Sequence, residues 1–172
     1  MSTLKPAVNN DDHIEGSLSA PVEIVEFGDY QCPYCRQAYP IIKDIQVLFE
    51  GQIKFIFRNF PLAELHQYAF LAAQSAEAAA LQGKFWEMHD AIYENQARLS
   101  DDLFLELAGG LGLDLEKFKQ DVASAEVKEK VEGDFESGVR SGVNGTPSFY
   151  VNGEKFDGGA IDLRNMLNES AE

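Results

Sequence analysis

Cys32 and Cys35, separated by two residues, are the side chains of this sequence best suited to chemistry, and the chain has no other cysteine. They follow a β-branched stretch and begin an amphipathic helical pattern. Two thiols with this spacing in a first helical turn can close a disulfide. The partial positive charge at a helix N-terminus stabilises whichever sulfur is a thiolate. The pair therefore predicts thiol–disulfide exchange.

Metal binding is the other chemistry that two cysteines support, because zinc accepts two cysteines together with two histidines. The three histidines, His13, His66 and His89, are scattered along the chain without ligand spacing. We therefore expect no metal site and no other cofactor. His89 lies on an apolar helical face and is interpreted as a core residue, whereas His66 is expected near a helix N-terminus.

The elements that must position the cysteines are a strand, a helix and a second strand. Residues 22–27 are rich in β-branched and aromatic side chains and predict a strand. Its two glutamates, Glu23 and Glu26, point to opposite faces, so a sheet covered on both faces must bury one of them. The helical pattern continues to about Phe49, with a proline inside it, and residues 53–57 predict the second strand. This order favours a right-handed βαβ unit.

Helical patterns dominate the middle of the chain, and strands return near its end. Helices are predicted at 65–81, 84–95, 100–111 and 114–122, the last two capped by Ser100 and Asp114, and a longer helix follows around 127–139. Strands at 148–151 and 154–156 are joined by the hairpin signal Asn152-Gly153, and a final helix follows. We predict an α/β fold divided as follows: an N-terminal tail at 1–20, a main domain from 21–63 and 124–172, and an inserted helical subdomain at 64–123. A short added strand near Ile14 is the alternative for part of the tail.

The acidic composition excludes several partners. Fourteen basic and 29 acidic side chains give a formal net charge of −15, which repels nucleic acid and anionic membranes. We expect neither to be a partner. No stretch approaches the roughly 18 uncharged apolar residues of a membrane span, and no secretory signal is visible. Because both cysteines lie in one motif, none is left to crosslink the fold, so a cytoplasmic, reducing location is expected.

Three motifs in order resemble the DsbA-like branch of the thioredoxin superfamily. They are Glu-Phe-Gly-Asp-Tyr-Gln-Cys-Pro-Tyr-Cys at 26–35, Arg-Asn-Phe-Pro-Leu at 58–62, and Gly-Thr-Pro at 145–147. The resemblance covers roughly residues 20–170. It implies a thioredoxin fold with an inserted all-helical subdomain, acting as a protein disulfide oxidoreductase.

The resemblance also implies roles for the two thiols and for the residues between them. Cys32 would be the exposed nucleophile, with a pKa lowered by the helix N-terminus, and Cys35 the buried resolving thiol. Pro33 has a fixed φ and no donor to lose, which suits the first helical turn. Pro33 and Tyr34 are expected to contact the substrate.

Three further residues receive roles from the same resemblance. Glu26 would be a buried proton acceptor for Cys35, with a pKa raised by desolvation; the alternative is a partly exposed strand glutamate. Thr146 and Pro147 correspond to the cis-proline loop, in which the backbone of Thr146 would pair with an extended substrate segment. Partners would then be protein thiols and disulfides or glutathione, together with a redox protein that recycles the dithiol, and a monomer is expected.

Two features leave alternatives open. Tyr34 stands where the most oxidising DsbA proteins have a histidine, so the reduction potential should be more negative than theirs. The tetrad Cys-Pro-Tyr-Cys is also that of many glutaredoxins, although those are shorter and lack the helical insertion. The alternative function is therefore a glutaredoxin-like or binding module that holds zinc or an iron–sulfur cluster with the same cysteines.

Overall fold

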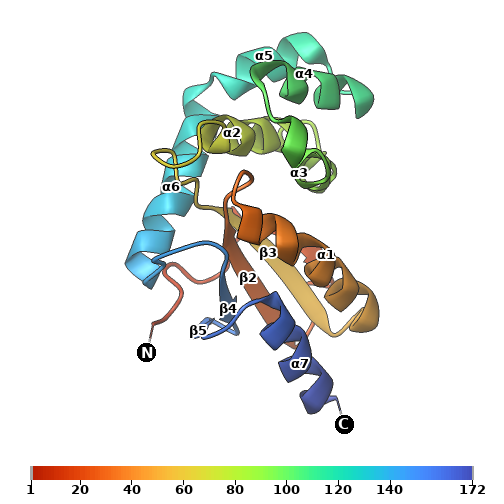
Figure 1. Ribbon diagram of the computed structural model, residues 1–172, viewed down its shortest axis with the longest axis vertical. Coiled ribbons are helices and arrows are strands. Elements are labelled where there is room, and N and C mark those ends of the chain that lie inside the picture. Colours follow the sequence, from red (N-terminus) through yellow and green to blue (C-terminus); the bar gives the residue numbers. More distant parts are fainter. Residues whose placement is uncertain (1, 172) are drawn as a thin grey trace. The chain divides into compact units, whose positions relative to one another are not determined.

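The computed structural model describes residues 2–171. In this part of the chain, five strands form one sheet in the order β1-β3-β2-β4-β5 (Figure 1). The strands are β1 (His13–Gly16), β2 (Val22–Gly28), β3 (Ile53–Asn59), β4 (Ser148–Val151) and β5 (Glu154–Phe156). The pairs β1–β3, β2–β4 and β4–β5 are antiparallel. The mixture of sheet and helices confirms the predicted α/β class.

The predicted strand–helix–strand unit is present. β2 and β3 are neighbours in the sheet, and α1 (Pro33–Leu48) connects them in the chain. The helix buries Cys35, Ala38, Ile42 and Ile45, which recur on one face. Helix α7 (Ala160–Ser170) lies beside α1. Apolar packing along one stripe of α1 therefore fixes the helix that carries Cys35.

The chain folds into two compact units. The sheet unit consists of Met1–Gly28, Pro33–Arg58 and Glu136–Glu172, and the helical unit of Asp29–Cys32 and Asn59–Phe135. The helical unit is thus larger than the insertion predicted at 64–123. Within it, the rings of Phe60 and Phe135 stack with their centroids 4.3 Å apart. Contacts of this kind attach the flanking segments to the helices, and sequence periodicity does not report such contacts.

The helices of the helical unit agree with the predicted pattern except at one start. They are α2 (Ala69–Ala80), α3 (Phe85–Glu94), the short 3-10 helix η1 (Gln96–Arg98), α4 (Asp101–Gly110), α5 (Leu115–Val122) and the first part of α6 (Ala125–Ser141). The predicted caps are confirmed, because Ser100 accepts from the amide of Leu103 and Asp114 from that of Lys117. Helix α2 begins four residues later than predicted, since residues 62–66 form a turn. Among the described residues, no helix has both the length and the apolar character of a membrane span.

The first twenty residues are not the tail that the sequence predicted. β1 adds an edge strand beside β3. At the other edge, Thr3 bridges Glu154, and the amide of Leu4 donates to the carbonyl of Gly153 (2.8 Å). Leu4 is buried. The segment covers both edges of the sheet and so satisfies backbone groups that an open edge leaves unpaired. Its polar composition concealed this role.

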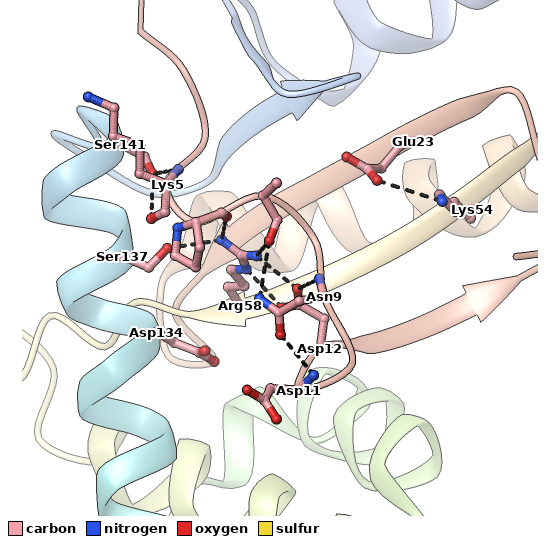
Figure 2. A network of polar contacts seen from close by, with 12 residues as sticks. Lys5, Asn9, Asp11, Asp12, Glu23, Lys54, Arg58, Asp134, Ser137 and Ser141 are labelled. Atoms are coloured by element: carbon pink, nitrogen blue, oxygen red, sulfur yellow. Dashed lines mark hydrogen bonds and ion pairs between the residues drawn. The ribbon is translucent and has the colours of Figure 1, made fainter.

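Arg58 is the second-to-last residue of β3, and its side chain holds the N-terminal segment around Pro6 and Asp12 in place (Figure 2). Its Nε and Nη2 donate to the two carboxylate oxygens of Asp12, and each donor–acceptor distance is 2.8 Å. Its Nη1 donates to the carbonyl of Pro6 (2.9 Å) and to the hydroxyl of Ser137 (3.0 Å). The side chains of Arg58 and Asp12 are 2% and 4% exposed. This bidentate, buried pair joins residues 46 positions apart in the sequence.

The β4–β5 hairpin follows the sequence signal. Asn152 and Gly153 both have positive φ, at 49° and 86°, as a two-residue turn between antiparallel strands requires. Tyr150, in β4, donates its hydroxyl to the carbonyl of Ser141, and burial raises the pKa of this phenol. The hairpin therefore completes the sheet on the side of β2.

Candidate active site

The two cysteines flank the first two residues of α1. Cys35 lies on the buried face of the helix and is 1% exposed. Cys32 is also buried, at 4% exposed, which corrects the expectation of an exposed thiol. Pro33 and Tyr34 between them are exposed, Tyr34 at 68%. The dithiol is thus a buried pair joined by two surface residues.

Cys32 is buried because it ends a turn that the helical unit holds closely. The amide of Cys32 donates to the carbonyl of Asp29 (3.1 Å), which closes the turn 29–32. Inside the turn, the amide of Gln31 donates to Oδ1 of Asp29 (2.8 Å). An aspartate in this position folds its side chain onto the backbone two residues ahead. Asp29 therefore shapes the chain immediately before Cys32.

The other carboxylate oxygen of Asp29 holds a second turn. Oδ2 accepts from the amide of Leu62 (2.9 Å) and lies 2.7 Å from Nδ1 of His66. The amide of His66 in turn donates to the carbonyl of Leu62 (2.9 Å), so one carboxylate contacts both ends of the turn 62–66. The side chain of Asp29 is 0% exposed and that of His66 is 20% exposed. An ionised carboxylate only accepts, so the histidine presents an N–H to it.

The remaining residues of the turn 29–32 also contact the helical unit. Gln31 accepts from the amide of Tyr68 at the start of α2 (2.7 Å). The ring of Tyr30 lies 5.0 Å from that of Tyr93 and 5.6 Å from that of His89. His89 is 4% exposed, which confirms it as a core histidine. Sequence reasoning did not identify these partners of Asp29 and Gln31, because they lie more than thirty positions away.

Glu26 is buried in β2, at 3% exposed, so the alternative of a partly exposed glutamate is wrong. It lies opposite Phe149 of β4. Its Oε2 would be 2.7 Å from a Cβ atom at Gly28, and the ring of Phe57 would be 2.5 Å from the same point. The carboxyl group therefore turns toward the end of β2, where only glycine fits between it and Phe57.

Thr146 and Pro147 directly precede β4. The peptide bond between them is cis. The next residue, Ser148, lies opposite Phe27 in the antiparallel β2–β4 pair. Within the sheet unit, the Thr146–Pro147 loop and Glu26 therefore belong to the same end of neighbouring strands.

The described residues contain no group of three or more histidine, cysteine or acidic side chains arranged to hold a metal ion. His66 and His89 each lie against an aspartate instead, His66 against Asp29 and His89 against Asp90.

A family model described as thioredoxin matches residues 8–167. The chain belongs to the thioredoxin family. The matched range includes the strands from β1 onward, both cysteines and the whole helical insertion. The insertion is therefore part of the family pattern that the chain follows.

Two solved structures are similar to this thioredoxin-family chain over nearly its full length. BdbD from Bacillus subtilis, in its oxidised form, has a TM-score of 0.84 and 25% identity, and the match covers 98% of this chain and 96% of that one. A thioredoxin-like oxidoreductase from Silicibacter pomeroyi DSS-3 has a TM-score of 0.77 and 27% identity, with coverage of 95% and 94%. These similarities confirm the DsbA-like thioredoxin fold that the motifs implied.

One relative of this thioredoxin-family chain is named as an ion antiporter rather than as a thioredoxin. The Na(+)/H(+) antiporter NhaA 3 of Salinispora tropica is 40% identical over 147 residues, which are 86% of this chain but 22% of that protein. The chain thus spans about a fifth of the length of the curated relatives that it matches.

Proposed function

We propose that this chain is a thiol:disulfide oxidoreductase that exchanges disulfides with protein substrates through Cys32 and Cys35. The observation that carries the proposal is the position of the two thiols. Both flank the first residues of α1 in a thioredoxin-family fold, with Pro33 and Tyr34 at the surface between them. A helix N-terminus favours a thiolate at this position.

The exchange proceeds in two balanced steps. The thiolate of Cys32 attacks one sulfur of a substrate disulfide, whose S–S bond breaks, and the first substrate sulfur leaves as a thiolate. Cys35 then loses its proton and attacks the sulfur of Cys32. The mixed disulfide breaks, the Cys32–Cys35 disulfide forms, and the second substrate thiolate leaves. The substrate gains two electrons and the protein loses two; the reverse sequence oxidises a substrate.

Glu26 is the proposed acceptor for the proton of Cys35. It is the buried carboxyl group of β2, and it turns toward the end of the strand that leads to the active-site turn. A buried carboxylate is costly unless it has a partner or a task. Proton transfer through water gives this carboxylate such a task.

Substrate contact is assigned to the surface residues of the motif and to the loop before β4. Pro33 and Tyr34 are exposed and offer a polypeptide its first contact. The backbone of Thr146, before Pro147, pairs with an extended segment of the substrate, in the manner of strand addition. Because Cys32 is buried, attack requires the side chains around its sulfur to move aside, while the backbone of the turn 29–32 keeps its conformation.

The direction of exchange depends on the redox poise of the surroundings. Without a histidine at position 34, the reduced form lacks one stabilising donor, so we propose a potential closer to that of thioredoxin, about −270 mV, than to that of DsbA, about −120 mV. A separate redox protein or glutathione would recycle the dithiol. The expected cytoplasmic location and monomeric state stay predictions.

The antiporter name belongs to relatives of which the matched segment makes up only 22% to 26% of the length. The segment that they share with this chain contains the thioredoxin fold. We therefore assign disulfide exchange, rather than ion transport, to this part of the sequence.

The test is reduction of insulin with dithiothreitol as the electron donor. The Cys32→Ser variant should lose more than about 99% of the catalysed rate, because the attacking sulfur is gone. The Cys35→Ser variant should accumulate a mixed disulfide with the substrate, visible by mass spectrometry on a non-reduced sample. Equal rates for the wild type and Cys32→Ser would overturn the proposal. A coloured or zinc-containing protein after anaerobic purification would favour the binding-module alternative.

A further inference from the structure

The side chain of Gln96 makes an unusual contact with the cysteine motif. Its Nε2 donates to the carbonyl of Tyr30 (2.8 Å) and to the carbonyl of Cys32 (3.0 Å). Gln96 is the first residue of η1 and is half-buried, and it lies 64 positions after Cys32. Both carbonyls and the glutamine belong to the helical unit. The amide thus spans the last part of the turn 29–32.

The chemistry of the carboxamide suits this contact. A primary amide carries two N–H donors on one nitrogen, and the carbonyls of Tyr30 and Cys32 are two acceptors. Holding both carbonyls fixes the backbone on the two sides of the Cys32 nitrogen and Cα, and so fixes the direction in which the thiol points. Asp29 and His66 act on the start of the turn, whereas Gln96 contacts Cys32 itself.

The same contact also affects charge. Carbonyl oxygens carry partial negative charge, which disfavours a nearby thiolate. An N–H group pointed at each oxygen offsets that charge and prevents the carbonyls from turning toward the sulfur. A glutamine at position 96 therefore favours both the geometry and the ionisation that attack requires.

We propose that Gln96 is a positioning residue for Cys32, holding the thiol in its reactive orientation through the backbone of the turn. The inference rests on the proposed function, because it assigns Cys32 as the attacking sulfur. Gln96 touches neither the substrate nor the reacting atoms. Its effect should appear in the reactivity of one thiol.

The helical unit contains a matched control. Gln82 also uses its side-chain amide for two backbone hydrogen bonds, donating to the carbonyl of Asp114 (3.1 Å) and accepting from its amide (2.9 Å). It is half-buried, like Gln96, and has no such contact with the turn 29–32. The variants Gln96→Met and Gln82→Met therefore each remove two hydrogen bonds from the same unit at similar side-chain size.

The experiment measures the alkylation rate of Cys32 by iodoacetamide, in a Cys35→Ser background so that only one thiol reacts. Rates are recorded from about pH 5 to about pH 9, which brackets the usual titration of a thiol. Gln96→Met should slow alkylation at neutral pH by about tenfold, which is the scale of one net hydrogen bond. The same variant should shift the pH profile of the alkylation rate to higher pH. Gln82→Met should leave both unchanged. Gln96→Glu should be slower still, since its carboxylate has no donor and repels the two carbonyls.

Urea unfolding of all three variants keeps the result separate from loss of fold. Gln96→Met and Gln82→Met should lose similar stability, while only the former changes thiol reactivity. Equal alkylation by Gln96→Met and the wild type would overturn the inference, as would equal slowing by Gln82→Met. Alkylation needs no substrate disulfide, so a wild type that fails to reduce insulin would overturn the proposed function alone.

Discussion

Arg58 and Asn59 are consecutive residues at the end of β3, yet their side chains belong to two buried polar clusters of different character. The Arg58 cluster, in the sheet unit, pairs one guanidinium with the carboxylate of Asp12 and adds Pro6 and Ser137 as acceptors (Figure 2). Each of the three guanidinium nitrogens has an acceptor, and the charges balance.

The Asn59 cluster, in the helical unit, contains two buried carboxyl groups. The Nδ2 of Asn59 donates to one carboxylate oxygen of Glu77 and one of Asp134, and each donor–acceptor distance is 2.9 Å. The backbone amide of Asn59 donates to Asp134 as well (3.0 Å), and Nζ of Lys130 lies 2.6 Å from its other oxygen. Lys130 thus pairs with Asp134, and the second buried carboxylate of the cluster is that of Glu77. Burial, together with the nearby Glu77, raises the pKa of Asp134, although Lys130 opposes the shift.

The difference shows that neighbouring residues can stabilise their own units by different means. The Arg58 cluster is a complete ion pair between one guanidinium and one carboxylate. The Asn59 cluster should respond to pH, because one of its carboxyl groups resists ionisation. Both residues belong to Arg-Asn-Phe-Pro-Leu, one of the three motifs on which the family resemblance was based.

The largest expected effect is that of Asp12→Ala. The substitution leaves the guanidinium of Arg58 buried without its carboxylate, which should lower the free energy of unfolding by about 3–5 kcal/mol. Urea denaturation measures the loss. Asp11→Ala, at the exposed neighbouring residue, is the control and should change stability by less than about 0.5 kcal/mol. Similar losses for both variants would show that the ion pair does not hold the segment.

The Asp134→Asn variant tests the acid-rich cluster. Because the pKa of Asp134 is raised in the folded protein, the unfolded chain loses this proton first as the pH rises above the ordinary value of 3.8. The free energy of unfolding therefore falls with rising pH, by about 1.4 kcal/mol for each unit by which the pKa is raised. Asp134→Asn has no proton to lose, so this part of the decline should disappear.

Urea unfolding between about pH 4 and pH 8 measures that slope. The control lies on the same helix: Glu132 pairs with Lys128 at the spacing that Asp134 has with Lys130, but both partners are exposed. Glu132→Gln should keep the wild-type slope. An unchanged slope in Asp134→Asn would mean that its carboxyl group titrates normally.

The smallest effect should come from Ser137→Ala. This variant removes one acceptor of Arg58, while Nη1 retains the carbonyl of Pro6. The expected loss is about 1 kcal/mol, the net value of one hydrogen bond, again measured in urea. A loss as large as that of Asp12→Ala would show that the hydroxyl, rather than the carboxylate, dominates the cluster.

Much of the fold could be predicted from the sequence because its signals are local. The stripe of α1, the caps Ser100 and Asp114 and the Asn152-Gly153 turn depend on residues at most a few positions apart. The predicted start of α2 was wrong because a local signal was followed: Leu65 fits the helical period. A carboxylate 37 positions before His66, that of Asp29, holds residues 62–66 in a turn instead.

The features of the candidate site also divide into those that local sequence signals predicted and those that depend on distant residues. The spacing of Cys32 and Cys35 predicted the dithiol. The strand pattern required that at least one of Glu23 and Glu26 be buried, and the family resemblance indicated Glu26. The burial of Cys32 did not follow, since it depends on how residues far along the chain close around the turn 29–32. For Asp29, a signal was available in its position three residues before Cys32. For Gln96, we find no signal in the sequence.

The sequence by itself determined the chemistry of this protein: which sulfur atoms are present, how far apart they lie in the chain and which helix begins between them. Only the tertiary structure decided how the first sulfur is held and covered. The reason is physical. Helical periodicity, caps and turns arise from interactions within a few residues, whereas the hydrogen bonds of Asp29 and Gln96 join segments 33 to 66 positions apart and exist only after the chain has folded.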